Sequence, residues 1–222
     1  MARTLYFISG SPFAWRAMLT LAFKGLEYTA VELHGSKGDT QTPEHLARNP
    51  RGKVPVLVDG DVTVYESVAI MAYLERAYPE TPLFGNTPAE AAHIWQRVME
   101  VDGYLGASLA AAARPLFTQT FAGKEDEINQ GFADVRTEIA TVTGWLDGND
   151  FMAGDTPTAV EVILYPHLAM IARVGPAINV PGITPNIPDY ATEFPALAAW
   201  MKRVEALPGF EAAYPPHWRE AA

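Results

Sequence analysis

A serine followed by a proline stands where the first strand of the chain should turn into its first helix. Ser11, Pro12 and Phe13 come shortly after the apolar run of residues 5–8. Serine is a favoured helix N-cap because its oxygen accepts from an unpaired backbone N–H, and proline suits the first helical position. Ser11 would then lie at the positive end of a helix dipole, where an anion is stabilised. A purely structural cap is the other interpretation, and these residues alone do not decide between the two.

Several other kinds of site are excluded by the residue types present. None of the 222 residues is cysteine, so the chain can form no disulfide and has no thiolate of its own. The five histidines show no i,i+4 pairing, and a metal site is therefore not expected. They are His34, His45, His93, His167 and His217. The GxGxxG, P-loop and GxSxG motifs are also missing from the sequence.

The charge balance of the chain limits its partners. Acidic residues outnumber basic ones by 26 to 16, which gives a net charge of -10. Because affinity for nucleic acid comes largely from Lys and Arg, no nucleic-acid partner is expected. The sequence has neither an apolar run long enough to span a membrane nor a signal-peptide pattern at its start, so we expect a cytoplasmic protein without membrane contact.

The elements around Ser11 are predicted to form a βαβ unit. Residues 3–9 have the pattern of a strand, and residues 12–24 that of a mostly buried helix whose polar positions, Arg16, Thr20 and Lys24, fall on one narrow stripe. A second strand is predicted at residues 28–33. Two strands joined by a helix over so short a stretch should be parallel.

The next residues predict a hairpin and a third helix. A short helix should begin at Pro43, and two β-branched runs then flank an Asp-Gly step at residues 59–60, which is a hairpin signal. A further helix is expected over residues 66–78. Together these elements predict a four-stranded sheet, with one parallel pair and one antiparallel hairpin, and with helices on its faces.

After a linker rich in proline and glycine at residues 79–86, the pattern becomes entirely helical. Thr87 to Glu90 form a capping box at the start of a long helix, which Pro115 should end. Apolar residues at alternating steps of four and three predict a second long helix over residues 128–146. The chain thus divides into an α/β domain, residues 1–79, and an all-α domain, residues 88–222.

Two more helices are expected in the second half. Thr158 and Glu161 form another capping box, heading an apolar helix in which Pro166 should cause a bend or a break. A last clear helix should start at Phe194 and run to about Ala206. The segment between these helices has the composition of a loop.

This layout and three motifs resemble the cytosolic glutathione transferases over essentially the full chain. Residues 49–57, Asn-Pro-Arg-Gly-Lys-Val-Pro-Val-Leu, are similar to the segment that carries the family's cis-proline. Tyr65-Glu66-Ser67 resembles the Glu/Gln-Ser step of its third helix, and Ser11-Pro12-Phe13 with Arg16 resembles the serine-type site of the phi, tau and zeta-like classes. The resemblance implies a thioredoxin-like domain followed by a helical bundle, and a homodimer.

The resemblance also implies a catalytic role for Ser11. Its hydroxyl would donate a hydrogen bond to the sulfur of glutathione, the co-substrate. A free thiol has a pKa of about 8.5, so only a few per cent is ionised at neutral pH. A hydrogen bond to the anion and the N-terminus of a helix both favour the thiolate. Ser9 and Tyr6 are the alternatives for this role.

Other residues would hold the rest of glutathione, as implied by the resemblance. Val54 would pair its backbone with the cysteinyl part, which a cis bond at Pro55 permits. Glu66 would bind the γ-glutamyl ammonium and Ser67 the adjacent carboxylate. Lys53 would contact the glycyl end.

The chain departs from the family pattern in two places. Where the phi pattern has a His-Lys pair before the second helix, this chain has Thr40 and Gln41, and Lys37 is the possible substitute partner for the glycyl carboxylate. Where the family usually has Asp in a Ser/Thr-x-x-Asp box, this chain has Glu161 after Thr158. Glutamate can still complete a capping box, so the helix should form.

The second substrate would be a small hydrophobic electrophile, as expected for a detoxification enzyme. Four residues could form walls of its pocket, although packing or solvent exposure would explain each of them as well. They are Phe13, Tyr104, Arg114 and Phe117. The predicted function is conjugation of glutathione. The alternatives are glutathione-dependent isomerisation, ether cleavage or dehalogenation, and a non-catalytic binding module of the same fold.

Overall fold

The computed structural model describes residues 3–219 and divides the chain into two compact units. The first unit contains the chain up to Leu83 together with the segment from Glu205 onward, and the second is Phe84–Val204. The predicted domains, 1–79 and 88–222, remain a prediction. Nothing in the residue pattern had indicated that the segment after Glu205 would pack with the first unit.

A four-stranded sheet lies at the centre of the first unit. Its strands are β1 (Arg3–Phe7), β2 (Thr29–Glu32), β3 (Val56–Asp59) and β4 (Val62–Tyr65), in the order β2-β1-β3-β4. β1 pairs in parallel with β2, and the other two pairings are antiparallel. The predicted sheet, with its parallel pair and its hairpin, is confirmed.

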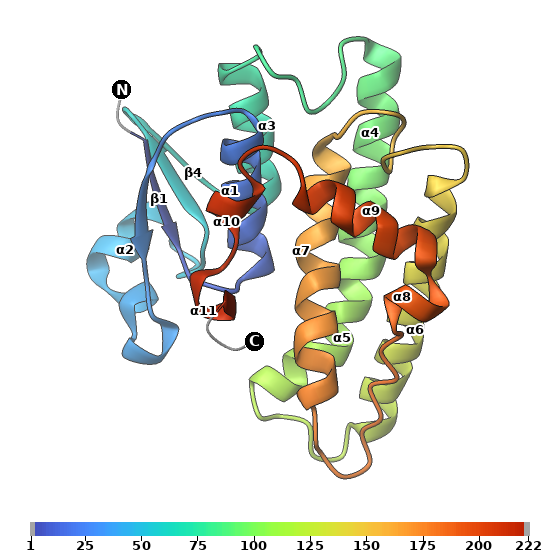
Figure 1. The fold of residues 1–222 in the computed structure, drawn as a ribbon. Helices are drawn as coiled ribbons and strands as arrows, with labels where there is room; N and C mark the ends of the chain where they lie inside the picture. Colours follow the sequence, from blue (N-terminus) through green and yellow to red (C-terminus); the bar gives the residue numbers. More distant parts are fainter. Residues whose placement is uncertain (1–2, 220–222) are drawn as a thin grey trace. The chain divides into compact units, whose positions relative to one another are not determined.

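Three helices cover the two faces of this sheet (Figure 1). They are α1 (Pro12–Phe23), α2 (Pro43–Arg48) and α3 (Ser67–Ala77). α1 and α3 pack side by side on one face, and α2 lies on the other. The predicted cap at Ser11 is present, and Thr42 caps α2 in the same way, because each side chain accepts from the backbone N–H three residues later.

The polar stripe of α1 is buried, as are most of the apolar residues of the helix. Arg16, Thr20 and Lys24 have exposed fractions of 1%, 0% and 8%. The ammonium of Lys24 donates to the backbone oxygens of Tyr78 and Thr81, at 2.9 and 2.7 Å, and forms an ion pair of 2.7 Å with Glu75. This one side chain therefore ties the end of α1 to α3 and to the segment that follows it.

We expect Lys24→Met to lower the free energy of unfolding by about 3 kcal/mol, because it leaves a partly buried carboxylate without its cation and two carbonyl groups without a donor. Methionine keeps most of the aliphatic volume, so packing should change little. Urea denaturation measures the effect. Lys202→Met, on an exposed face of α9 (Pro195–Glu205), is the control and should change stability by less than about 0.5 kcal/mol. Equal stabilities of the two variants would contradict the prediction.

The last segment of the chain packs against α1. It contains two short helices, α10 (Phe210–Ala213) and α11 (Pro216–Arg219). Three of its aromatic rings surround Trp15, which is 1% exposed. The ring centroids of Phe210, Tyr214 and Trp218 lie 6.2, 5.5 and 5.4 Å from that of Trp15. We call these three rings the aromatic clasp.

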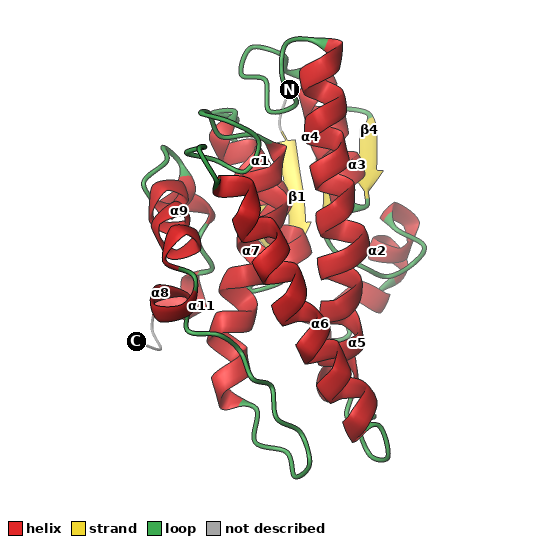
Figure 2. Cartoon of the chain, turned by 90° about the vertical axis from the view of Figure 1, so that its right-hand side faces the viewer, coloured by secondary structure: helices red, strands yellow, loops and turns green. Residues whose placement is uncertain are grey.

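The second unit consists of helices (Figure 2). α4 (Pro88–Glu100), the π-helical turn Val101–Leu105 and α5 (Gly106–Phe117) follow one another without a break. α6 (Glu125–Thr143) packs against α5, and α7 (Ala159–Val174) packs against α4. The short elements of this unit are α8 (Tyr190–Glu193) and the 3-10 turns Gly144–Leu146 and Gly175–Ala177. The first unit contains the 3-10 turns Gly35–Lys37 and Asp39–Gln41. Among the described residues, no helix is both long enough and apolar enough to cross a membrane.

Two prolines do not end the helices that contain them. Pro115 was predicted to stop its helix, but α5 continues to Phe117, because proline lacks only its own N–H and the N–H of Thr118 still bonds to the oxygen of Arg114 at 3.0 Å. A break at Pro166 is likewise wrong, since α7 runs through it. The residues on both sides of Pro166 are buried, and their packing outweighs the preference of proline against a helix interior.

Glu161 is a fully buried carboxylate at the start of α7. It accepts hydrogen bonds from the backbone N–H groups of Met152 and Thr158, both at 2.7 Å, from the Thr158 hydroxyl at 2.9 Å and from the indole N–H of Trp200 at 3.2 Å. The predicted capping box is thus confirmed, with Glu in the position where Asp was expected from the family pattern. Burial raises the pKa of the Glu161 carboxyl, and the four donors oppose this shift.

Candidate active site

A tight turn sets the position of Ser11. The N–H of Ser11 donates to the oxygen of Ile8 at 3.1 Å, which leaves Ser9 and Gly10 as the central residues of a β-turn. Gly10 has φ +80°, a conformation that suits glycine. Beyond the turn, the N–H of Ala14 donates to the Ser11 oxygen at 3.3 Å. The Ser11 oxygen therefore acts here as an acceptor, and its hydroxyl proton can be donated to a ligand.

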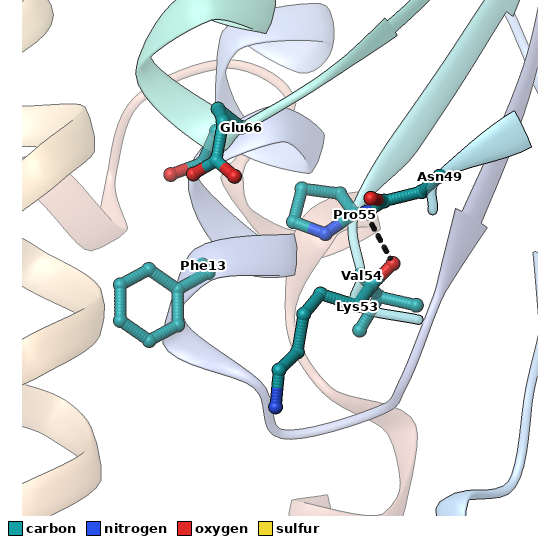
Figure 3. Close-up of a pocket in the computed structure, with 7 residues that line it drawn as sticks. Phe13, Asn49, Lys53, Val54, Pro55 and Glu66 are labelled. Carbon is teal, nitrogen blue, oxygen red and sulfur yellow. Dashed lines mark hydrogen bonds between the residues drawn. The ribbon is translucent and has the colours of Figure 1, made fainter. Parts of the chain in front are cut away.

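Next to this helix start is a pocket of about 190 Å³, lined by seven residues of the first unit. They are Phe13, Asn49, Lys53, Val54, Pro55, Glu66 and Ser67. Figure 3 shows the Glu66 carboxylate on one side of the pocket and the Lys53 ammonium on the opposite side, with Phe13 and Pro55 between them. All five residues predicted to hold glutathione line this pocket. Ser11 is not among the lining residues, although Phe13, two positions later, is.

One end of the pocket is formed where β4 turns into α3. Glu66 precedes the helix with φ +70°, which is uncommon for a residue with a side chain and is often found at functional sites. Ser67 begins α3 and is 6% exposed. The guanidinium of Arg16 donates to the Ser67 hydroxyl at 3.3 Å. The buried positive charge of Arg16 is therefore in contact with Ser67, which was predicted to bind a carboxylate of glutathione.

The segment on the other side of the pocket is held by two buried side chains. Asn49 and His45 both donate to the backbone oxygen of Lys53, each at 3.0 Å, and the N–H of Arg51 donates to Asn49 at 3.0 Å. The Val54–Pro55 peptide bond is cis. Sequence reasoning had assigned no role to Asn49, although an asparagine before proline at a helix end is a turn signal that could have identified it.

The residues that replace the family's His-Lys pair lie beside this segment. The Gln41 amide donates to the Thr40 hydroxyl at 3.3 Å and to the oxygen of Gly52 at 3.4 Å. Gln41 therefore contacts the residue just before Lys53. Lys37 belongs to the 3-10 turn Gly35–Lys37 and is not one of the pocket-lining residues.

The predicted electrophile residues are distributed over both units. Phe13 is 47% exposed at the pocket, with the Arg16 guanidinium 4.9 Å from its ring centroid. Tyr104 instead lines a separate hollow of the second unit, together with residues such as Glu138 and Trp145. Arg114 and Phe117 are exposed on α5. Because these three residues belong to the second unit, their part in one pocket with Phe13 remains a prediction.

Tyr6 has a packing environment, as expected for the less favoured alternative to Ser11. The Arg48 guanidinium lies 4.3 Å from the Tyr6 ring centroid, and the ring of His45 lies edge-on at 6.4 Å. These contacts are on the α2 side of β1. They support structural packing as the role of Tyr6.

Comparison with known proteins gives consistent matches along the chain. Residues 1–76 match the family described as "Glutathione S-transferase, N-terminal domain", and residues 106–208 match "Glutathione S-transferase, C-terminal domain". "Glutathione S-transferase F10" of Arabidopsis thaliana is 31% identical over 72% of this chain and 76% of its own length. "Glutathione S-transferase A" of Pleuronectes platessa is 28% identical over 98% of this chain and 93% of its own length.

Solved structures agree with these sequence matches. The crystal structure of a glutathione S-transferase from the Antarctic clam Laternula elliptica aligns with a TM-score of 0.84 and 27% identity, covering 99% of this chain and 95% of that one. The thioredoxin-like unit, the helical unit and the Ser11 turn beside the pocket are thus found in a chain whose two halves match both family domains. The chain belongs to the glutathione S-transferase family.

Proposed function

We propose that this protein is a glutathione transferase that joins the sulfur of glutathione to a small hydrophobic electrophile. The observation that carries the proposal is the pocket between Glu66 and Lys53, which lies next to the helix start capped by Ser11. Glutathione carries an ammonium and a carboxylate at its γ-glutamyl end and a second carboxylate at its glycyl end. A pocket with a carboxylate at one end and an ammonium at the other is complementary to this distribution of charge.

Each part of glutathione has a partner in this arrangement. Glu66 would accept from the γ-glutamyl ammonium, and Ser67 would donate to the adjacent carboxylate, supported by the charge of Arg16. The backbone of Val54 would pair with the cysteinyl residue. Lys53 would bind the glycyl carboxylate, in a segment that Asn49 keeps fixed.

The thiol of the bound glutathione would then lose its proton to solvent. The Ser11 hydroxyl and the N–H groups at the start of α1 stabilise the resulting anion. Lowering the thiol pKa by two units corresponds to about 2.7 kcal/mol and makes the thiolate the major form near neutral pH. The thiolate donates an electron pair to an electrophilic carbon, forming the C–S bond, while a leaving group departs with the electron pair of the bond that breaks. The exposed ring of Phe13 would form part of the electrophile's surroundings.

Calorimetric titration tests this proposal directly. Glutathione and S-methylglutathione are titrated into the protein in buffers of different ionisation enthalpy between pH 5.5 and 9. We expect both to bind, and only glutathione to release close to one proton at neutral pH. Binding of both without this difference would show a peptide pocket that does not activate sulfur. Absence of binding to the folded protein would reject the proposed function. If glutathione binds and releases a proton, a screen of electrophiles separates conjugation from isomerisation, ether cleavage and dehalogenation.

Glu66→Gln should raise the dissociation constant of glutathione about tenfold, because a charge-assisted hydrogen bond to the ammonium becomes a neutral one. The effect should be the same for S-methylglutathione, since Glu66 is assigned to the far end of the peptide. Asp61→Asn, an exposed site in the β3–β4 hairpin, makes the same change in net charge and should leave the constant unchanged. Similar affinities of the two variants would show that Glu66 does not contact the ligand.

We also propose that the protein is a cytoplasmic homodimer, as is typical of this family. Multi-angle light scattering of the purified chain is expected to give twice the mass of one chain. A mass of one chain at micromolar concentration would reject the dimer without bearing on the glutathione site.

A further inference from the structure

A histidine near the end of the chain is hydrogen-bonded to the turn that precedes Ser11. The Oγ of Ser9 and the Nδ1 of His217 are 2.7 Å apart, although 208 positions separate them in the sequence. Ser9 is the first central residue of the turn closed by Ile8 and Ser11. A hydroxyl can donate or accept, so this bond can form with either tautomer of the imidazole and with its protonated form.

The imidazole of His217 also lies close to Gly10, the second central residue of the turn. A Cβ built on Gly10 would lie 2.9 Å from Cε1 and 3.2 Å from Nε2 of His217, and 3.3 Å from Nε1 of Trp218. A real Cβ does not come as close as 2.9 Å to another heavy atom, so a side chain at position 10 would require His217 to move. The turn is therefore in close contact with His217 at both of its central positions.

His217 is adjacent in sequence to Trp218, one of the three rings of the aromatic clasp. Its neighbour Trp218 is 7% exposed and packs edge-on against Trp15, with the rings at 90° and their centroids 5.4 Å apart. Trp15 is on α1, one helical turn after Ser11, and its backbone N–H donates to the backbone oxygen of Ser11 at 2.9 Å. The segment that carries His217 is thus packed against the helix that Ser11 caps.

We infer that His217 is a positioning residue for Ser11, acting through the Ser9–Gly10 turn. This inference rests on the proposed function, because it assigns His217 to the placement of the hydroxyl that stabilises the glutathione thiolate. The turn alone is held by one backbone hydrogen bond and contains a flexible glycine. Contact with His217 at both central residues restricts the conformations of this turn, and with them the direction of the Ser11 hydroxyl.

A nucleophilic role for Ser9 is the other interpretation of a serine bonded to a histidine. Such a serine requires a base that a third group orients. Within residues 3–219, His217 has Ser9 as its hydrogen-bond partner and no carboxylate bonded to its other nitrogen. His217 also contacts Gly10, and Ser9 is a central residue of the turn. Both observations favour a role of His217 in positioning Ser11 over a nucleophilic role of Ser9.

The test compares four variants by two measurements. His217→Ala and Ser9→Ala remove the bond from either side, and His217→Asn keeps a polar atom near the position of Nδ1. Tyr214→Leu weakens the aromatic clasp and keeps the side chains of Ser9 and His217. The first measurement is hydrogen exchange of the Ser11 amide, which closes the turn, and the second is the pH profile of kcat/KM for glutathione.

In His217→Ala and Ser9→Ala we expect Ser11 amide exchange to become about fivefold faster and kcat/KM to fall about fivefold at neutral pH, as for the loss of one hydrogen bond. The pH profile should move upward by about 0.7 units, which corresponds to the same factor. Binding of S-methylglutathione should not change. His217→Asn should show only a small part of either effect. The double variant His217→Ala with Ser9→Ala should be no worse than either single variant.

Unchanged Ser11 exchange in the folded His217→Ala and Ser9→Ala variants would overturn the inference. The same would follow if Tyr214→Leu accelerated Ser11 exchange equally, because the effect would then belong to the packing of the whole segment. If His217→Ala does not fold, Ser9→Ala decides alone. The exchange measurement needs no glutathione, so a failure of the proposed function leaves this test of the turn intact.

Discussion

Ser11→Ala is expected to lower kcat/KM about 100-fold for the conjugation of glutathione with an activated aryl chloride. The hydroxyl is assigned to the thiolate, and a lost hydrogen bond to an anion costs about 1.5–3 kcal/mol. The apparent pKa of the bound thiol should rise by one to two units for the same reason. Binding of S-methylglutathione should change less than threefold, since a thioether carries no charge for the hydroxyl to stabilise. Stopped-flow kinetics as a function of pH and calorimetry provide these values.

The control for this variant must lose a helix cap without losing a catalytic group. Thr87→Ala provides it, because Thr87 caps α4 in the second unit, with a proline at the next position and a bond of 3.2 Å from the N–H of Glu90. Both variants should lose about 1 kcal/mol of stability through the missing cap. Only Ser11→Ala should lose activity at pH 7. Full activity of Ser11→Ala would show that Ser11 is a structural cap, and that the thiolate is stabilised in another way.

Glu161→Ala should have the largest effect on stability, a decrease of about 4 kcal/mol in the free energy of unfolding. The substitution leaves the buried N–H groups of Met152, Thr158 and Trp200 without an acceptor, and each such loss costs about 1–3 kcal/mol before the surroundings relax. It also opens a cavity in the fully buried start of α7. Urea denaturation of the variant and of the parent chain measures the difference.

The second capping box of the chain supplies a matched control. Glu90 accepts from the backbone N–H groups of Asn86 and Thr87 at 2.7 and 3.2 Å, as Glu161 does from its own cap, but Glu90 is exposed. Water can replace the lost carboxylate there, so Glu90→Ala should cost about 1 kcal/mol. Comparable losses in the two variants would mean that burial of Glu161 contributes nothing beyond the cap itself.

The stability that Glu161 contributes should also depend on pH. Burial raises the pKa of the Glu161 carboxyl above its value in the unfolded chain, which is about 4.3. The native state then binds the proton more tightly than the unfolded state, so the contribution is complete below about pH 4 and decreases as the pH rises through the native pKa. Glu161→Gln does not titrate, and its stability should approach that of the parent chain between pH 5 and 8. If the parent chain becomes increasingly more stable than Glu161→Gln as the pH rises, the four hydrogen-bond donors lower the pKa of Glu161 more than burial raises it.

The fold of the first unit was largely predictable because its signals are local. Serine or threonine followed by proline marked the starts of α1 and α2, and the Asp-Gly step marked the β3–β4 hairpin. The helix ends of the second unit were less predictable. Pro115 and Pro166 have strong local preferences against helix, but packing between helices decides their outcome, and sequence periodicity contains no measure of packing.

The site was predictable where it depends on short motifs and not where it depends on distant contacts. Glu66 and Ser67 are adjacent in the sequence, and Lys53 to Pro55 are consecutive, so their grouping in one pocket followed from two segments. The contact of Arg16 with Ser67 joins positions 51 apart, and that of Ser9 with His217 joins positions 208 apart. Neither contact has a periodic or motif signal, so only the folded structure shows them.

The order in which the chain is synthesised gives the aromatic clasp a further consequence. Trp15 belongs to the first helix made, but the rings that cover it come from residues 210–218, which leave the ribosome after the whole of Phe84–Val204. At about 5–20 residues per second, the interval is on the order of 10 s. During that time the nascent first unit exposes the large indole of Trp15 to solvent, and the Ser9–Gly10 turn lacks its contact with His217. The turn that precedes Ser11 is therefore among the last parts of this protein to gain its native contacts.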